Sequence, residues 1–172
     1  MTSYDSLKKE LSWKHNDDLF FKELKEGHAW QELPATFFRL HGLPVEIPEL
    51  KVRESIDQAE QWIGTVDLIV AGRKLEIKSR NEIFTSPMSF PYDTVFVDTV
   101  SGYDAKNPKP LAYIMISRPT GAMLCLKANN SNGWSIEKKF DNVRKIHDDF
   151  YMCKKQMLQP LNFLLSFIKN GK

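Results

Sequence analysis

Three charged side chains of the segment DLIVAGRKLEIKSR, residues 67–80, are spaced so that a β-hairpin brings them together. Side chains alternate between the two faces of a strand, so Glu76 and Lys78 share one face of the second strand. Asp67, at the start of the first strand, falls opposite this pair. Two carboxylates facing each other repel, and a divalent cation removes that cost by using both as oxygen ligands. A nearby lysine can orient a water and stabilise charge during phosphodiester hydrolysis, so this spacing is typical of metal-assisted hydrolysis.

The clustering of the three charges does not depend on which residues form the turn. A two-residue turn at Ala71-Gly72 places Asp67 opposite Glu76, whereas a turn at Gly72-Arg73 places it opposite Lys78. Either register keeps the charges on one face. It packs the apolar residues on the other face: Val66, Leu68, Val70, Leu75 and Ile77.

In this segment Asp67 is followed, after eight residues, by Glu76-Ile77-Lys78. This spacing resembles the pattern of the PD-(D/E)xK nuclease superfamily, which includes restriction enzymes and Holliday-junction resolvases. The resemblance is good over residues 67–80 and extends loosely back to Asp17. It implies that Asp67 and Glu76 bind Mg²⁺ or Mn²⁺ together with the backbone carbonyl of Ile77. It also implies that Lys78 positions the nucleophilic water and that Arg80 leads toward the nucleic acid and contacts it.

Three further E-x-K triplets lack this context, since none follows an apolar strand that carries an aspartate at hairpin distance. They are Glu23-Lys25, Glu49-Lys51 and Glu137-Lys139. The chain departs from the family pattern in two places. Val66 stands where the family often has proline, and residues 81–110 show no helical periodicity, although the family core usually has a helix after the E-x-K strand.

Many members of the superfamily add a glutamate from the first helix to the metal site. Glu32 is the favoured candidate here, because it precedes Gly42, the expected end of that helix, by ten residues. Glu23 and Glu26 are the alternatives, and with their neighbouring lysines they have the pattern of a solvated helix face.

The elements that must position these residues indicate an α+β domain spanning residues 1–172, with a restriction-endonuclease-like mixed sheet, an N-terminal helical segment and a C-terminal helix. Residues 17–41 have helical periodicity, with a break or kink near Pro34. The expected strands follow as a run. They cover residues 43–55, 62–70, 74–80, 93–100, 111–118, 121–128 and 134–140, and a helical stretch is expected from about Asp141, broken at Pro160.

Composition adds weaker constraints on compartment and partners. Residues 1–60 carry eight Lys and Arg against twelve Asp and Glu, whereas residues 61–172 carry sixteen against ten. A basic C-terminal part is compatible with phosphate contact or with random unevenness. Two cysteines without a C-x-x-C, no signal-peptide pattern and no apolar run of membrane length lead us to expect a soluble, cytoplasmic protein without a membrane partner.

The sequence therefore predicts a Mg²⁺- or Mn²⁺-dependent nuclease acting on nucleic acid, with DNA favoured over RNA and a homodimer as a possible assembly. The apolar segment LNFLLSFI, residues 161–168, is expected to dock on the sheet or to form that dimer contact. Two alternatives stay open. One is an inactive protein of the same fold that binds nucleic acid or a protein partner, and the other is an unrelated interaction domain with a polar hairpin.

Overall fold

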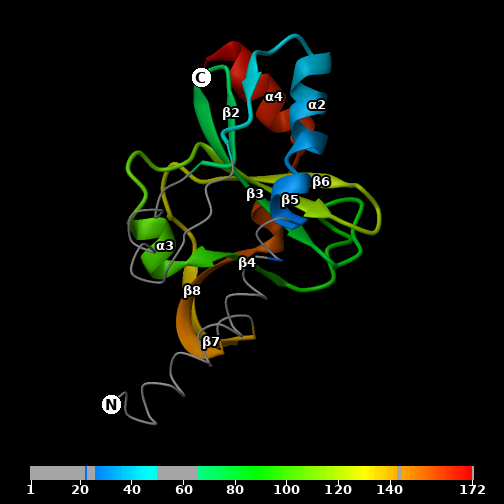
Figure 1. Ribbon diagram of the computed structural model, residues 1–172. Helices are drawn as coiled ribbons and strands as arrows, with labels where there is room; N and C mark the ends of the chain where they lie inside the picture. Colours follow the sequence, from blue (N-terminus) through cyan, green and yellow to red (C-terminus); the bar gives the residue numbers. More distant parts are fainter. Residues whose placement is uncertain (1–21, 23–25, 50–65, 143–144, 172) are drawn as a thin grey trace, which may run out of the picture.

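The computed structural model describes residues 22, 26–49, 66–142 and 145–171. The fold is α+β with a mixed sheet, an N-terminal helix and a C-terminal helix, which confirms the predicted class (Figure 1). The helices are α2 (Glu32–Leu40), α3 (Val100–Asp104) and α4 (Leu161–Asn170), and residues 26–29 are also helical. The strands are β1 (Val45–Glu46), β2 (Leu68–Val70), β3 (Arg73–Arg80), β4 (Thr94–Thr99), β5 (Ala112–Ser117), β6 (Met123–Lys127), β7 (Ser135–Asp141), β8 (Ile146–Lys154) and β9 (Gln159–Pro160).

Two sheets organise the described part of the chain. The larger has the order β1-β2-β3-β5-β6-β9, in which β3 and β5 run parallel and the neighbouring pairs are antiparallel. The smaller sheet has the order β4-β8-β7 and is antiparallel. The connection from β3 to its parallel neighbour β5 runs through β4 and α3, so this crossover contributes one strand of the smaller sheet and a short helix, whereas β7 and β8 follow β6.

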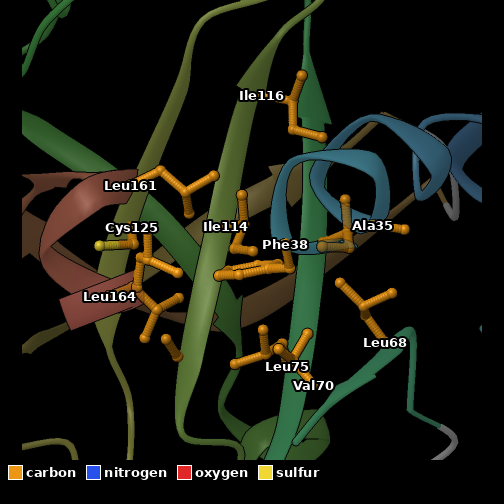
Figure 2. Packing of buried hydrophobic residues seen from close by; sticks show 13 residues of the cluster. Ala35, Phe38, Leu68, Val70, Leu75, Ile114, Ile116, Cys125, Leu161 and Leu164 are labelled. Atoms are coloured by element: carbon orange, nitrogen blue, oxygen red, sulfur yellow. The ribbon is translucent and has the colours of Figure 1, made fainter. Parts of the chain in front are cut away.

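One face of the larger sheet packs against α2 and α4, as Figure 2 shows. Phe38 of α2 and Leu164 of α4 meet Leu75 of β3 and Ile114 of β5 in a cluster that water does not reach. Burial of each large apolar side chain of this kind contributes about 1.5–3 kcal/mol to folding. The apolar residues of the 67–80 hairpin are therefore in the core, as the alternation predicts.

The opposite face of the same sheet packs against the smaller sheet. Tyr113 and Met115 of β5 and Leu126 of β6 contact a cluster that includes Val95 and Val97 of β4. Strand β3 has β2 and β5 on its two edges. On its polar side Glu76 is buried, whereas Lys74, Lys78 and Arg80 are partly exposed. The polar side is therefore only partly accessible to solvent.

Several elements differ from the sequence-based expectation. The segment from about Asp141 was predicted to be helical, but residues 146–154 form β8, and the helix begins only at Leu161. Strand β8 is stabilised by β4 on one edge and β7 on the other, and the pairs Lys138–Asp149 and Lys139–Asp148 place opposite charges across the strands. Tertiary pairing overrides local helical preference in this segment.

The second difference is α3, in the segment where no helix was predicted. Its five residues are too few to produce a periodic pattern, and its beginning is fixed by Thr99, whose Oγ1 accepts from the N–H of Gly102 at 2.9 Å. The predicted interruption of the helical segment near Pro34 is confirmed, since α2 begins at Glu32, after a turn at residues 30–31. The predicted strands 43–55 and 62–70 are shorter than expected: within the described residues they form only β1 (Val45–Glu46) and β2 (Leu68–Val70), and residues 50–55 and 62–65 lie outside the described part. Within the described ranges, no helix has the length and apolarity needed to cross a membrane.

Candidate active site

The β2–β3 hairpin brings Asp67 next to Glu76. Leu68 pairs with Leu75 and Val70 with Arg73, which leaves Ala71 and Gly72 as the two-residue turn. Both turn residues have positive φ, 47° and 75°, the geometry that matches the twist of a tight hairpin. The first of the two predicted registers is therefore the observed one.

Asp67 lies at the point where β2 separates from β3. Its Oδ2 accepts from the backbone N–H of Ile77 at 2.8 Å, a donor that β2 no longer reaches, because that strand starts only at Leu68. Its Oδ1 accepts from Nε2 of Gln31 at 3.3 Å. These two bonds fix the carboxylate over the middle of β3.

The side chain of Glu76 is buried, and 7% of the residue's surface is exposed. It lies within hydrogen-bonding reach of Asp67. Burial first, and the negative charge of Asp67 second, raise the pKa of Glu76 to about 8. Burial also raises the pKa of Asp67, against the opposing effects of the Ile77 hydrogen bond and the charge of Lys78. The pair thus needs either a shared proton or a cation.

Asp98 of β4 anchors the two lysines beside this pair. Its carboxylate accepts from Nζ of Lys78 at 3.4 Å and from Nζ of Lys106 at 2.8 Å. The Tyr113 hydroxyl donates to it at 2.7 Å and the backbone N–H of Thr99 at 2.9 Å. Burial alone would raise the pKa of Asp98, but the charges of both lysines and the hydrogen bonds lower it to about 2.

The two lysines differ in access to solvent and in electrostatic role. The side chain of Lys78 is 28% exposed, and its ammonium also lies 5.7 Å from the centre of the Tyr113 ring. Lys106 is nearly enclosed. Burial would lower the pKa of Lys106, but the carboxylates of Glu76 and Asp98 raise it, so this lysine stays charged. Burial and Asp98 likewise raise the pKa of Tyr113, which keeps its hydroxyl a donor.

The structure does not bring Glu32 to this site. Its side chain is 65% exposed at the start of α2, where it pairs with Arg39 at 3.2 Å. The preceding residue, Gln31, contacts Asp67 instead. Glu26 pairs with Arg118 at 3.4 Å, and Glu23 lies outside the described residues. The helical element is therefore placed beside Asp67, as expected, but it presents an amide there and not a carboxylate.

Arg80 is largely enclosed and tied to β4. Its guanidinium donates to the backbone carbonyl of Phe96 and lies 5.4 Å from the centre of the Phe96 ring. Burial lowers the pKa of Arg80. It also lines a cleft of about 280 Å³ together with Tyr92 and Lys139. A nucleic-acid contact by Arg80 stays a prediction, and in this structure the side chain joins the two sheets.

Four residues around Asp67 and Glu76 were not predicted from the sequence: Gln31, Asp98, Lys106 and Tyr113. The one available signal was Asp98, a charged residue inside the apolar strand TVFVDT. A β-bulge between Phe96 and Asp98 breaks the alternation, so Val97 and Asp98 are both buried. Alternation alone therefore does not reveal which way Asp98 points.

The residues around Asp67 fit a hard divalent cation that keeps part of its water shell. The pair offers two carboxylates. Gln31 is only 6% exposed, and its Oε1 is a buried acceptor that has no hydrogen-bond partner among the described residues. In the described ranges, no three His, Cys, Asp or Glu side chains lie close enough to form a metal cage by themselves. Such an ion would depend on Asp67, Glu76, a backbone carbonyl and water, a donor set typical of Mg²⁺.

Comparison of the chain with protein-family models, curated proteins and solved structures finds no match. The evidence for function is therefore the chemistry of the site. The fold alone does not identify an activity, because one fold supports many activities.

The proton on Glu76 predicts an unusual pH dependence of stability. Between the ordinary value of 4.5 and about 8, Glu76 holds a proton in the folded chain but not in the unfolded chain. Stability of the metal-free protein should therefore fall as pH rises through this window, by about 2–4 kcal/mol. Thermal unfolding in EDTA should show a melting temperature roughly 5–10 °C lower at the upper end of the window.

Glu76→Gln should remove most of this slope, because the amide is neutral at every pH. Glu137→Gln, on the exposed strand β7, is the matched control and should follow the unmodified protein. If the melting temperature of Glu76→Gln fell with pH as steeply as that of the unmodified protein, Glu76 would not be the titrating group.

Proposed function

We propose that the chain is a metal-dependent nuclease that hydrolyses phosphodiester bonds, with DNA the favoured substrate. The observation that carries this proposal is the pair Asp67 and Glu76, held in hydrogen-bonding reach of each other on one face of a hairpin that also carries Lys78. Natural proteins rarely bury carboxylates without a compensating partner. A cation between the two groups would supply that compensation, and it would at the same time serve the chemistry.

Asp67, Glu76 and the Ile77 carbonyl are the residues that would hold the ion. When bound, Mg²⁺ or Mn²⁺ would lower the pKa of a coordinated water and help neutralise negative charge on the phosphoryl group. The unpartnered Oε1 of Gln31 could accept from a coordinated water, while its Nε2 keeps Asp67 oriented.

Lys78 is suited to positioning the attacking water and stabilising charge. An ammonium has three N–H donors, and the contact with Asp98 uses one, which leaves two for water and phosphate oxygen. Asp98 is a positioning residue, since its carboxylate accepts from the Lys78 ammonium and holds it beside the carboxylate pair. Lys106 supplies a second positive charge that favours ionised Glu76.

The resemblance to the PD-(D/E)xK superfamily supports the same proposal. The spacing of Asp67 and Glu76-Ile77-Lys78 is realised in a hairpin with the expected facing of side chains. A short helix, α3, lies after the E-x-K strand, in the region where the family core usually has one. Gln31 in place of a helical glutamate is a further departure from the family pattern.

A second candidate function is a binding protein of the same architecture without catalysis. It is favoured by the hydrogen bonds that the polar side chains already make within the protein. Asp98 accepts from Lys78 and Lys106, and Asp67 accepts from the N–H of Ile77. Such a network stabilises a unique core without any substrate.

Cleavage and metal binding together test the proposal. The full chain is incubated with labelled single-stranded and duplex DNA, and with RNA, in Mg²⁺, in Mn²⁺ and in EDTA. We expect cleavage with either metal and none in EDTA. Calorimetric titration with Mn²⁺ should show one site whose affinity rises as pH approaches about 8, because the proton on Glu76 competes with the ion.

The outcomes separate the two candidates. Nucleic-acid binding without cleavage in either metal would favour the binding protein. Cleavage that persists unchanged in EDTA would contradict a metal-dependent mechanism.

A further inference from the structure

A basic cleft adjoins the carboxylate pair at the turn end of β3. A cavity of about 10 Å³, room for a single water, lies against Glu76 and Lys106. Lys74 and Pro108 line this cavity and also line a larger cleft of about 410 Å³. The two spaces therefore share a wall, which places the cleft next to the cavity at Glu76.

The cleft is positively charged. Arg73, Lys74 and Lys109 line it, and no acidic side chain does so among the described residues. Within the same part of the chain, neither Arg73 nor Lys74 has an ion-pair partner. Lys109 is fixed by the carbonyls of Tyr103 and Asp104 at 2.8 and 2.7 Å, which leaves its third N–H for a ligand. A cleft with three cations and no acidic side chain among its described lining residues favours a polyanion.

The same cleft contains an aromatic surface. Phe167 of α4 is half-buried in its wall, and Nζ of Lys127 lies 4.9 Å from the ring centre. The side chain of Asn129 adds an amide that can donate and accept hydrogen bonds. Cations beside an aromatic ring are the combination by which proteins hold single-stranded nucleic acids, with phosphates on the cations and bases stacked on the ring.

We propose that this cleft binds a single strand of nucleic acid, with backbone phosphates at Arg73 and Lys109 and a base against Phe167. The volume of about 410 Å³ is that of a small-ligand pocket, which accommodates one or two nucleotides and not a duplex. The inference rests on the proposed function in one respect: the bound strand would continue past Lys74 to place its scissile phosphodiester at Asp67 and Glu76.

Binding is measured by fluorescence anisotropy in EDTA, where metal-dependent cleavage cannot occur. The probes are a labelled DNA strand of about 12 nucleotides, within the usual footprint of single-strand sites, and a duplex of the same sequence. We expect the single strand to bind more tightly. Its affinity should fall with salt by about 0.7 logarithmic units per logarithmic unit of salt for each phosphate contact.

Arg73→Gln should weaken single-strand binding by about fivefold to tenfold and reduce the salt slope by about 0.7, since one phosphate contact is lost. Phe167→Leu, which keeps an apolar side chain in the wall, should weaken binding by about fivefold or more. The matched control is Lys138→Gln, the same loss of charge on β7, where Lys138 is exposed and faces Asp149 across the strands. This control should bind within about twofold of the unmodified protein.

The cleft assignment would be overturned if Arg73→Gln and Phe167→Leu bound as tightly as Lys138→Gln, or if the duplex bound more tightly than the single strand. Failure of the cleft and failure of the nuclease proposal are distinguishable. Selective loss of binding in Arg73→Gln, with no cleavage by the unmodified protein, would retain the cleft and reject the nuclease. Metal-dependent cleavage with unchanged binding by Arg73→Gln would retain the nuclease and reject the cleft.

Discussion

Replacing Lys78 by methionine should reduce metal-dependent cleavage by about 10²–10³-fold while leaving metal binding nearly intact. The lysine lies beside the carboxylate pair and is not among the residues that would hold the ion. Its loss therefore removes charge stabilisation and water positioning, together with a positive charge that lowers the pKa of both carboxyls. Methionine is unbranched and similar in length, so it fills much of the space of the lysine stem. Initial cleavage rates and Mn²⁺ titration on the same preparation measure the two effects separately.

Asp67→Asn should behave differently, because it removes a negative charge at the ion. The asparagine oxygen can still accept from the N–H of Ile77, so the fold around the hairpin is preserved. We expect Mn²⁺ affinity to fall by at least about tenfold. Cleavage should fall by about 10³-fold, beyond the loss of affinity, since the water is no longer activated.

Lys139→Met is the matched control for Lys78→Met. Lys139 ends another E-x-K triplet, is exposed on β7 and pairs with Glu137 at 3.1 Å. Its replacement should leave cleavage unchanged. Retained turnover in Lys78→Met, with a melting temperature near that of the unmodified protein, would remove Lys78 from the proposed mechanism.

The hairpin could be predicted from sequence because its information is local. Alternation assigns the faces of β3, and Ala71-Gly72 permits the tight turn, so Asp67 and Glu76 meet without reference to the rest of the chain. What alternation left open was whether this polar face is wet. That depends on β4, which comes later in the sequence and contacts this face through Asp98 and the carbonyl of Phe96.

The prediction that Glu32 of the helix reaches the site was wrong for a geometric reason. Successive residues of a helix are about 100° apart, so Gln31 and Glu32 point in different directions, and an uncertainty of one residue in helix phase exchanges them. The chain carries Glu32 outward to Arg39 and Gln31 inward to Asp67. Helical periodicity located the correct turn of the helix but not the side chain that faces the site.

Asp98→Asn should cause the largest loss of stability of any single change in this cluster. The substitution keeps the shape of the side chain but leaves Lys78 and Lys106 without their shared counter-charge. Breaking a buried pair in this way costs about 3–5 kcal/mol. For a chain of this size, that loss lowers the melting temperature by roughly 10 °C.

The pH dependence gives this prediction a second, independent readout. The pKa of Asp98 is lowered from an ordinary value of 3.8 to about 2, so its contribution is fully present above 3.8 and is lost as pH falls through about 2. The difference in unfolding free energy between the unmodified protein and Asp98→Asn should therefore be constant near neutral pH and shrink below about pH 4. Urea denaturation at several pH values measures it.

Asp93→Asn is the control, because Asp93 immediately precedes β4 and its side chain is 94% exposed while pairing with Lys155. It should change stability by less than about 0.5 kcal/mol, as surface pairs usually do. If Asp98→Asn were equally mild, the lysines would not need Asp98 in the folded chain. Lys78 would then be held at the carboxylate pair by another contact, and the positioning role given to Asp98 would have to be abandoned.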